Sequence, residues 1–277
     1  MSYKKSKLLI LIFLFIHIDY IKMLNNSQKI KIMCMGDSIT FGYRVPGSYR
    51  KFLYHNLISK GYKIKMVGAQ NNKFEKYYYN NDNPSDYFEY QDDNSGFSAY
   101  TICAHKDRKG LLEKLKETNC LNLKPDIIIL LIGTNNVMDN IDFDLTINNF
   151  ISLIEYILNN MNKNSILFIN TIPDMNPNHE ANYNWFPYYR KDNIDDIEVK
   201  NDVNNNVKKY NNKIKEIIED YRNKNYNIRI EDLNPIIKDL DNLFIDGIHP
   251  NNNGYKIIGE FWTEIIDKYL KEINNTI

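Results

Sequence analysis

The stretch that decides the fold is IKIMCMGDSIT, residues 30–40. Its first part, Ile30–Met35, is a short, mainly apolar run that ends at Gly36, as a buried strand does. Ser38 then stands on the turn that leaves this strand. A serine there exposes its hydroxyl oxygen, and the N–H groups at the start of a following helix can face a developing negative charge. Alone, the triplet is a weak signal, because Asp and Ser are also ordinary turn and N-cap residues.

The rest of the chain alternates short apolar runs with amphipathic stretches. Four further strands are predicted, at Lys63–Val67, Asp126–Ile132, Ser165–Ile172 and Tyr226–Leu233. Helices are predicted at Ser48–Lys60, Asp107–Lys116, Asp144–Met161, Asn201–Arg222 and Gly254–Tyr269. Near-continuous apolar strands between helices indicate a parallel sheet covered on both faces. We therefore predict a three-layer α/β/α sandwich, with a flavodoxin-like, five-stranded parallel sheet in the order 2-1-3-4-5.

The amino-acid composition argues against several classes of protein. Hydrophobic residues make up 43% and charged residues 25% of the 277 residues, which are globular proportions. The 35 basic and 35 acidic residues give a net charge of zero, which argues against a general nucleic-acid binder. Three cysteines are too few for a disulfide scaffold and match no zinc-site spacing. Cys103 and Cys120 flank one helical segment and could pair in an exported protein.

The amino end reads as a separate segment. Lys4, Lys5 and Lys7 precede an apolar run, Leu8–Ile16, which is far shorter than the roughly 20 residues that span a bilayer. This pattern predicts a secretory signal peptide over residues 1–28, and an uncleaved anchor or a buried helix are the alternatives. We expect a secreted, extracellular domain over residues 29–277. Because residues 1–29 carry five lysines against one aspartate, the remainder carries a net charge of −4.

Two further motifs stand out, one directly after a predicted strand and one just before the last predicted helix. The first is GTNN, residues 133–136, where a side-chain amide could donate to an oxyanion, although an Asx turn is the simpler interpretation. The second is DGIHP, residues 246–250. Asp246 and His249 on a tight turn can lie side by side, so that the carboxylate fixes the imidazole tautomer and the other ring nitrogen faces a nucleophile.

Together, the order and placement of these motifs resemble the SGNH (GDSL-like) hydrolase superfamily, over essentially the whole chain after residue 29. GDS at residues 36–38 is similar to its first block, GTN at 133–135 to its third, and DGIHP at 246–250 to its fifth. Within the superfamily, the chain resembles the family-three carbohydrate esterases, whose known members are mostly acetylxylan esterases. That likeness rests on GSYR (47–50), VG (67–68), SGFSAYTI (95–102) and DGIHPNNNGY (246–255).

The resemblance implies an SGNH hydrolase fold and a serine-dependent site without metal or cofactor. Ser38 would be the nucleophile, His249 the base and Asp246 its partner. The oxyanion hole would consist of the Ser38 N–H, the Ala99 N–H and the Asn135 side chain.

The chain departs from the family pattern at two positions. Ala99 stands where these enzymes usually carry glycine, and it keeps the donor role provided that its backbone is not left-handed. Gly96 is the alternative donor. Asn136 stands where the third block usually has aspartate, and we expect this change to matter less.

The implied reaction is hydrolysis of acetyl esters on carbohydrate, with an acetylated polysaccharide or oligosaccharide such as plant xylan as substrate. We expect no nucleic-acid partner, and no membrane partner after signal cleavage. Aromatic residues at 77–79 and 185–189 could stack on sugar rings, or the long loops could pack on themselves. Two other function classes stay open: a lysophospholipase or thioesterase of the same fold, and a catalytically decayed carbohydrate-binding module. His55, His105 and His179 match no motif and are interpreted as structural or solvent-facing.

Overall fold

The structure is a computed structural model that describes residues 29–70, 93–190 and 194–275. The predicted signal peptide, residues 1–28, lies outside the described residues, as do the aromatic residues at 77–79. No helix within the described ranges combines the length and the apolar character that crossing a membrane requires.

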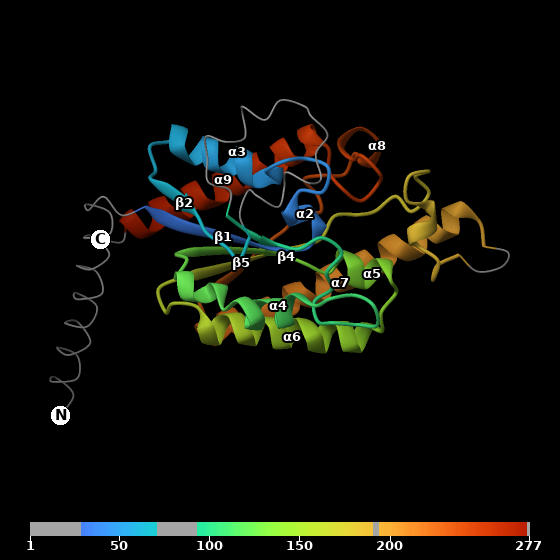
Figure 1. Ribbon diagram of the computed structural model, residues 1–277, viewed down its shortest axis with the longest axis horizontal. Coiled ribbons are helices and arrows are strands. Elements are labelled where there is room, and N and C mark those ends of the chain that lie inside the picture. The colour runs from blue at the N-terminus through green and yellow to red at the C-terminus, as the bar shows by residue number, and fades with distance from the viewer. Residues whose placement is uncertain (1–28, 71–92, 191–193, 276–277) are drawn as a thin grey trace.

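A parallel sheet forms the centre of the molecule (Figure 1). Its strands are β1 (Ile30–Gly36), β2 (Ile64–Met66), β3 (Ser95–Gly96), β4 (Ile127–Leu131), β5 (Ile166–Asn170) and β6 (Ile228–Glu231). They are ordered β2-β1-β4-β5-β6, and β3 pairs with the end of β1. The predicted order of the five long strands, 2-1-3-4-5, is therefore confirmed. The prediction missed β3, because two residues are too short to show a periodic pattern.

The strands lie where apolar residues run together. All five residues of β4, from Ile127 to Leu131, are buried, because neighbouring strands flank β4 and helices cover both of its faces. The pairs Ile32–Ile127 and Gly36–Leu131 fix the register of β1 against β4. This register brings the ends of the two strands to the same edge of the sheet.

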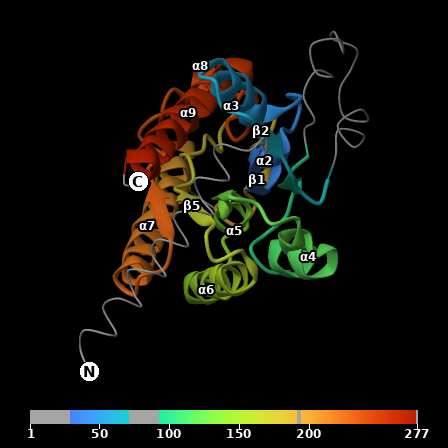
Figure 2. The same cartoon turned by 90° about the vertical axis from the view of Figure 1, so that its left-hand side faces the viewer.

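Helices cover both faces of the sheet (Figures 1 and 2). One layer contains α3 (Ser48–Ser59) and α9 (Asn252–Asn275). The opposite layer contains α4 (Leu111–Thr118), α6 (Phe143–Asn160) and α7 (Asp196–Asn223). In the first interface, Trp262 of α9 packs edge-on against Phe168 of β5, with ring centroids 5.6 Å apart. The predicted three-layer sandwich is confirmed.

Two helices begin four or five residues away from their predicted starts for local reasons. The helix expected from Asp107 begins at Leu111, because His105 and Arg108 pair across a tight turn before it. The helix expected from Asn201 begins at Asp196, because the side chain of Asp195 accepts a hydrogen bond from the Glu198 N–H and caps it.

The disulfide suggested for Cys103 and Cys120 does not form, and none of the three cysteines, all of which the structure describes, belongs to a disulfide. Cys120 is buried beside Ser95, whose hydroxyl lies 3.6 Å from its sulfur, whereas the Cys103 sulfur lies 3.9 Å from the Asn149 carbonyl oxygen. The two sulfurs therefore face different neighbours. Cys34 is buried in β1, as predicted.

Candidate active site

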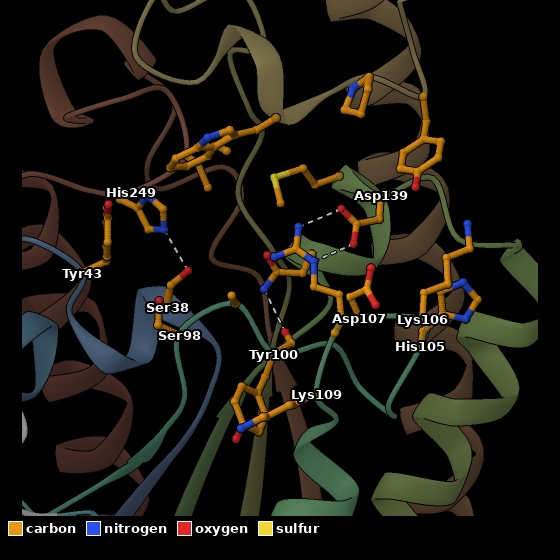
Figure 3. A pocket seen from close by; sticks show the side chains of 18 of the residues that line it. Ser38, Tyr43, Ser98, Tyr100, His105, Lys106, Asp107, Lys109, Asp139 and His249 are labelled. Atoms are coloured by element: carbon orange, nitrogen blue, oxygen red, sulfur yellow. Dashed lines mark hydrogen bonds and ion pairs between the residues drawn. The ribbon is translucent and has the colours of Figure 1, made fainter.

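At the carboxyl edge of the sheet, Ser38 meets two residues from a turn more than 200 positions later, Asp246 and His249. Ser38 is the first residue of α2 (Ser38–Phe41), which directly follows β1. Its Oγ lies 2.8 Å from Nε2 of His249, and Nδ1 of His249 lies 2.8 Å from Oδ2 of Asp246 (Figure 3 shows the contact of Ser38 with His249). All three side chains are buried. A hydroxyl, an imidazole and a carboxylate thus form one continuous hydrogen-bonded chain.

The turn that carries the imidazole also holds the carboxylate. Oδ1 of Asp246 accepts the N–H groups of Ile248, at 3.1 Å, and of His249, at 2.8 Å, which leaves Oδ2 for the ring. Gly247 lies between them at φ +78°, in the left-handed region that favours glycine. Burial raises the pKa of Asp246, but the hydrogen bonds and the charge of His249 outweigh it, so this pKa lies below its ordinary value. The carboxylate is therefore ionised beside the imidazole at neutral pH.

Asp37 starts the helix that bears the serine. It is the N-cap of α2, and its Oδ1 accepts the Ile39 N–H at 3.0 Å. The carboxyl group is completely buried and its Oδ2 makes no hydrogen bond within the described chain. Burial raises the pKa of Asp37 to about 6, although the Ile39 N–H and the charge of His249 act in the opposite direction.

A side-chain amide faces the serine from the next strand. Asn135 lies in α5 (Thr134–Met138), which directly follows β4. One N–H of its Nδ2 donates to the carbonyl oxygen of Tyr100 at 2.8 Å, which fixes the amide plane. Asn135 and Ser38 line the same cleft, so the second N–H of this amide can donate to a ligand there.

Neither Ala99 nor Gly96, the two alternatives for the backbone donor, has the conformation or the free N–H group that was expected of it. Ala99 lines the cleft, but its φ is +64°, so the condition that its backbone is not left-handed fails. The alanine adopts the glycine-like conformation at a cost of about 1–2 kcal/mol. The Gly96 alternative is wrong, because its N–H already donates to Oδ1 of Asn94 at 3.0 Å. Of the two positions, Ala99 is the one that lines the cleft.

A cleft of about 890 Å³ opens over these groups (Figure 3). Two aromatic rings contact the imidazole: the centroid of Tyr43 lies 4.5 Å from that of His249, and the centroid of Trp185 lies 6.1 Å away. Trp185 and Tyr188 are solvent-exposed at the cleft wall, whereas Phe186 between them is buried in the core. The aromatic run therefore divides between the cleft and the loop's own packing.

Sequence reasoning missed part of the cleft. His105 lines it, although no motif marked this residue, and Tyr43 contacts the imidazole. His179 is structural, as expected: its Nδ1 accepts the Ala181 N–H at 3.2 Å within a local turn. The only signal for the missed region was the density of charge in HKDRK, residues 105–109.

The fold and the arrangement of Ser38, Asp246 and His249 agree with the protein family that this sequence matches. The model of the GDSL-like lipase/acylhydrolase family matches residues 32–262, which include most of β1, both short site helices and the turn of His249. The chain belongs to the GDSL-like lipase/acylhydrolase family. The SGNH hydrolase fold expected for it is therefore confirmed.

Several proteins that are similar to this chain carry esterase names. A multidomain esterase of Ruminococcus flavefaciens is 34% identical over 252 residues, which are 88% of this chain but only 29% of that protein. The structure of a family 3 carbohydrate esterase of Clostridium thermocellum is similar at 26% identity and a TM-score of 0.62, covering 89% of this chain and 99% of that one. A family 3 carbohydrate esterase of Talaromyces cellulolyticus shares the fold at 19% identity and a TM-score of 0.59, with coverage of 88% and 99%.

Asn136, the second departure from the usual GDSL-family pattern, makes a hydrogen bond that holds a neighbouring segment. Its Oδ1 accepts the Ile102 N–H at 3.0 Å, as a carboxylate oxygen could. Its Nδ2 is buried and has no hydrogen-bond partner among the described residues. The amide therefore keeps the acceptor contact and adds an unsatisfied donor, which costs about 1–3 kcal/mol.

Proposed function

We propose that the chain is a serine esterase that removes acetyl groups from an acetylated plant polysaccharide outside the cell, with xylan as the leading candidate. The observation that carries the proposal is the pair of 2.8 Å contacts that join Ser38, His249 and Asp246. Such a chain of groups activates a serine for attack on an acyl carbon. The family supports acyl hydrolysis, and the relative of Clostridium thermocellum that is named a carbohydrate esterase supports a sugar ester.

The proposed reaction has two halves. Nε2 of His249 takes the hydroxyl proton of Ser38 while Oγ attacks the ester carbonyl carbon, and Asp246 stabilises the imidazolium. The side chain of Asn135 and the N–H groups of Ser38 and Ala99 donate to the tetrahedral oxyanion. The bond from the acyl carbon to the sugar oxygen then breaks, and His249 gives its proton to this oxygen, which leaves as a sugar hydroxyl. Water repeats the sequence on the acetyl-enzyme, which releases acetate and restores Ser38.

The character of the cleft favours a polar substrate over a lipid or a long-chain thioester. Besides its aromatic residues, the wall carries the charged residues of the segment 105–109 and Asp139. A long acyl chain would require an apolar groove, because charged groups are costly to desolvate. A decayed binding module is disfavoured for another reason: its serine, imidazole and carboxylate would have no need to keep hydrogen-bonding distances.

Trp185 is the proposed sugar platform. Its ring lies beside the ring of His249, with centroids 6.1 Å apart, and 36% of the residue is exposed. An exposed aromatic face next to the base can stack on a sugar ring and orient the ester toward Ser38. Because an acetyl group offers little surface, specificity would come from this sugar side. The expected signal peptide, residues 1–28, supports action on a polymer outside the cell.

The test is a substrate panel measured with the purified chain. We expect acetate release from acetylated xylan, and a steep fall in kcat/KM from acetyl to butyryl and longer 4-nitrophenyl esters. Ser38→Ala serves as the inactive control and should retain the circular dichroism spectrum of the wild type. Preference for octanoyl over acetyl esters, with no acetate released from acetylated xylan, would reject the proposal in favour of a lipid esterase.

A further inference from the structure

The cleft extends from the catalytic residues to a tight turn, His105–Arg108, on the opposite side (Figure 3). The His105 N–H donates to the Arg108 carbonyl oxygen at 3.0 Å, and the Arg108 N–H donates back at 2.9 Å. Lys106 lies at the tip with φ +48°, a left-handed conformation that costs a non-glycine residue about 1–2 kcal/mol. The turn thus holds Lys106 at a defined place by the cleft rather than on a free loop.

The two basic side chains of this turn have different partners. Arg108 forms a two-pronged ion pair with Asp139, with Nε to Oδ2 at 2.7 Å and Nη2 to Oδ1 at 2.8 Å. Lys106 has no carboxylate partner among the residues that the structure describes. Its ammonium group lies over the ring of Tyr188, 5.1 Å from the centroid. A cation and an exposed aromatic ring therefore stand together at this end of the cleft.

The net charge at this end of the cleft is opposite in sign to the net charge of the domain. Arg108 and Asp139 neutralise each other. The other charged residues of the segment 105–109 are two lysines, Lys106 and Lys109, and one aspartate, Asp107, so this part of the cleft lining carries a net positive charge. Outside residues 1–29, the chain carries a net charge of −4. A local excess of positive charge on an acidic domain attracts an anionic group to this position in particular.

We propose that Lys106 and Tyr188 form a subsite for a carboxylate-bearing sugar, a uronic acid unit of the acetylated polymer. Its ring would lie on Tyr188 and its carboxylate would pair with the ammonium of Lys106. Trp185 and Tyr188 are three residues apart on the same wall, so at most about 11 Å of chain separates them. A short oligosaccharide can span both rings while its acetyl group reaches Ser38. This subsite rests on the proposed deacetylase function.

The test compares two matched substrates: an acetylated xylo-oligosaccharide with one glucuronic acid branch, and the same compound after reduction of its carboxylate to an alcohol. For the wild type at low salt, we expect kcat/KM to be about fivefold higher for the acidic substrate, the effect of one exposed ion pair near 1 kcal/mol. This ratio should fall toward one in Lys106→Gln and in 0.5 M NaCl, because salt screens exposed charges.

The matched control is Lys163→Gln, which removes the same charge from an exposed position before β5, at the amino edge of the sheet. It should keep the wild-type ratio. Equal rates on both substrates, or an undiminished ratio in Lys106→Gln, would overturn the subsite and leave the deacetylase proposal intact. If 4-nitrophenyl acetate is hydrolysed but neither oligosaccharide releases acetate, the deacetylase proposal fails and the subsite fails with it.

Discussion

The buried carboxyl group of Asp37 should make the stability of this protein depend on pH in a direction opposite to that of a paired surface aspartate. Burial raises its pKa from 3.8 to about 6, so the folded state binds this proton more tightly than the unfolded state. The contribution of Asp37 to stability is therefore greatest below pH 3.8, declines as pH rises to about 6, and is constant above that. Asp37→Asn removes the titration. It keeps the cap of α2, since asparagine is an equally good N-cap residue.

The size of the effect follows from the two pKa values. The difference between 3.8 and about 6 corresponds to about 3 kcal/mol of stability, of which about 0.5 kcal/mol is already lost at pH 4. Relative to the wild type, Asp37→Asn should therefore gain about 2.5 kcal/mol between pH 4 and pH 7.5. For a domain of this size, this equals about 5–10 °C in Tm. A buried amide N–H without an acceptor costs free energy at every pH, so it does not alter this difference.

The assay is thermal unfolding of both proteins at pH 4 and pH 7.5, followed by circular dichroism at constant ionic strength. Asp142→Asn is the matched control, because Asp142 caps α6 from an exposed position where water solvates its carboxylate. This control reports the effect of exchanging a capping carboxylate for an amide at an exposed position. If the Tm difference between Asp37→Asn and the wild type is the same at both pH values, or shrinks as pH rises, the pKa of Asp37 is not raised in the folded protein.

Four further outcomes are expected, each measured as kcat or kcat/KM on folded protein. His249→Ala should lower turnover of 4-nitrophenyl acetate by several orders of magnitude and Asp246→Asn somewhat less, so near-normal rates would contradict their roles. Asn135→Ala should cost about 10²–10³ in kcat, as an oxyanion donor does, whereas a change in KM alone would count against it. Ala99→Gly should retain activity while Ala99→Val loses it, because a β-branched residue resists φ +64°. Trp185→Ala should reduce acetate release from polymer more than from the small ester, and an equal loss on both would exclude a sugar platform.

The long helices and strands could be predicted because buried segments have recognisable patterns of apolar residues in the sequence. The aliphatic run of β4 and the register that follows from parallel pairing place Ser38 and Asn135 at one edge. The D-x-x-H turn before α9 brings His249 to the same edge, since the spacing of its residues fixes a local geometry.

The cleft wall could not be predicted in the same way. The turn at His105–Arg108 replaces the first turn of a predicted helix, and no pattern of hydrophobic residues marks it. Lys106 and Ala99 adopt left-handed backbone conformations in which glycine is the residue that sequence reasoning expects. The contact of Tyr43 with the imidazole joins positions far apart in sequence, and only the tertiary fold produces it.

The two departures from the family pattern involve one segment, Ser95–Gly110, and the way this segment is held explains why they are tolerated. At its start, β3 pairs with the end of β1 beside Ser38, the proposed nucleophile, and at its end Gly110 pairs with Thr101. In between, Ile102 is held by Asn136, and the Tyr100 carbonyl accepts from Asn135. A left-handed alanine and an unsatisfied amide donor each cost only about 1–3 kcal/mol, and a segment fixed at this many points cannot relax locally to avoid them. The same contacts that fix the strained backbone also set the amide of Asn135, so the cost in stability and the order of the proposed oxyanion hole have one origin.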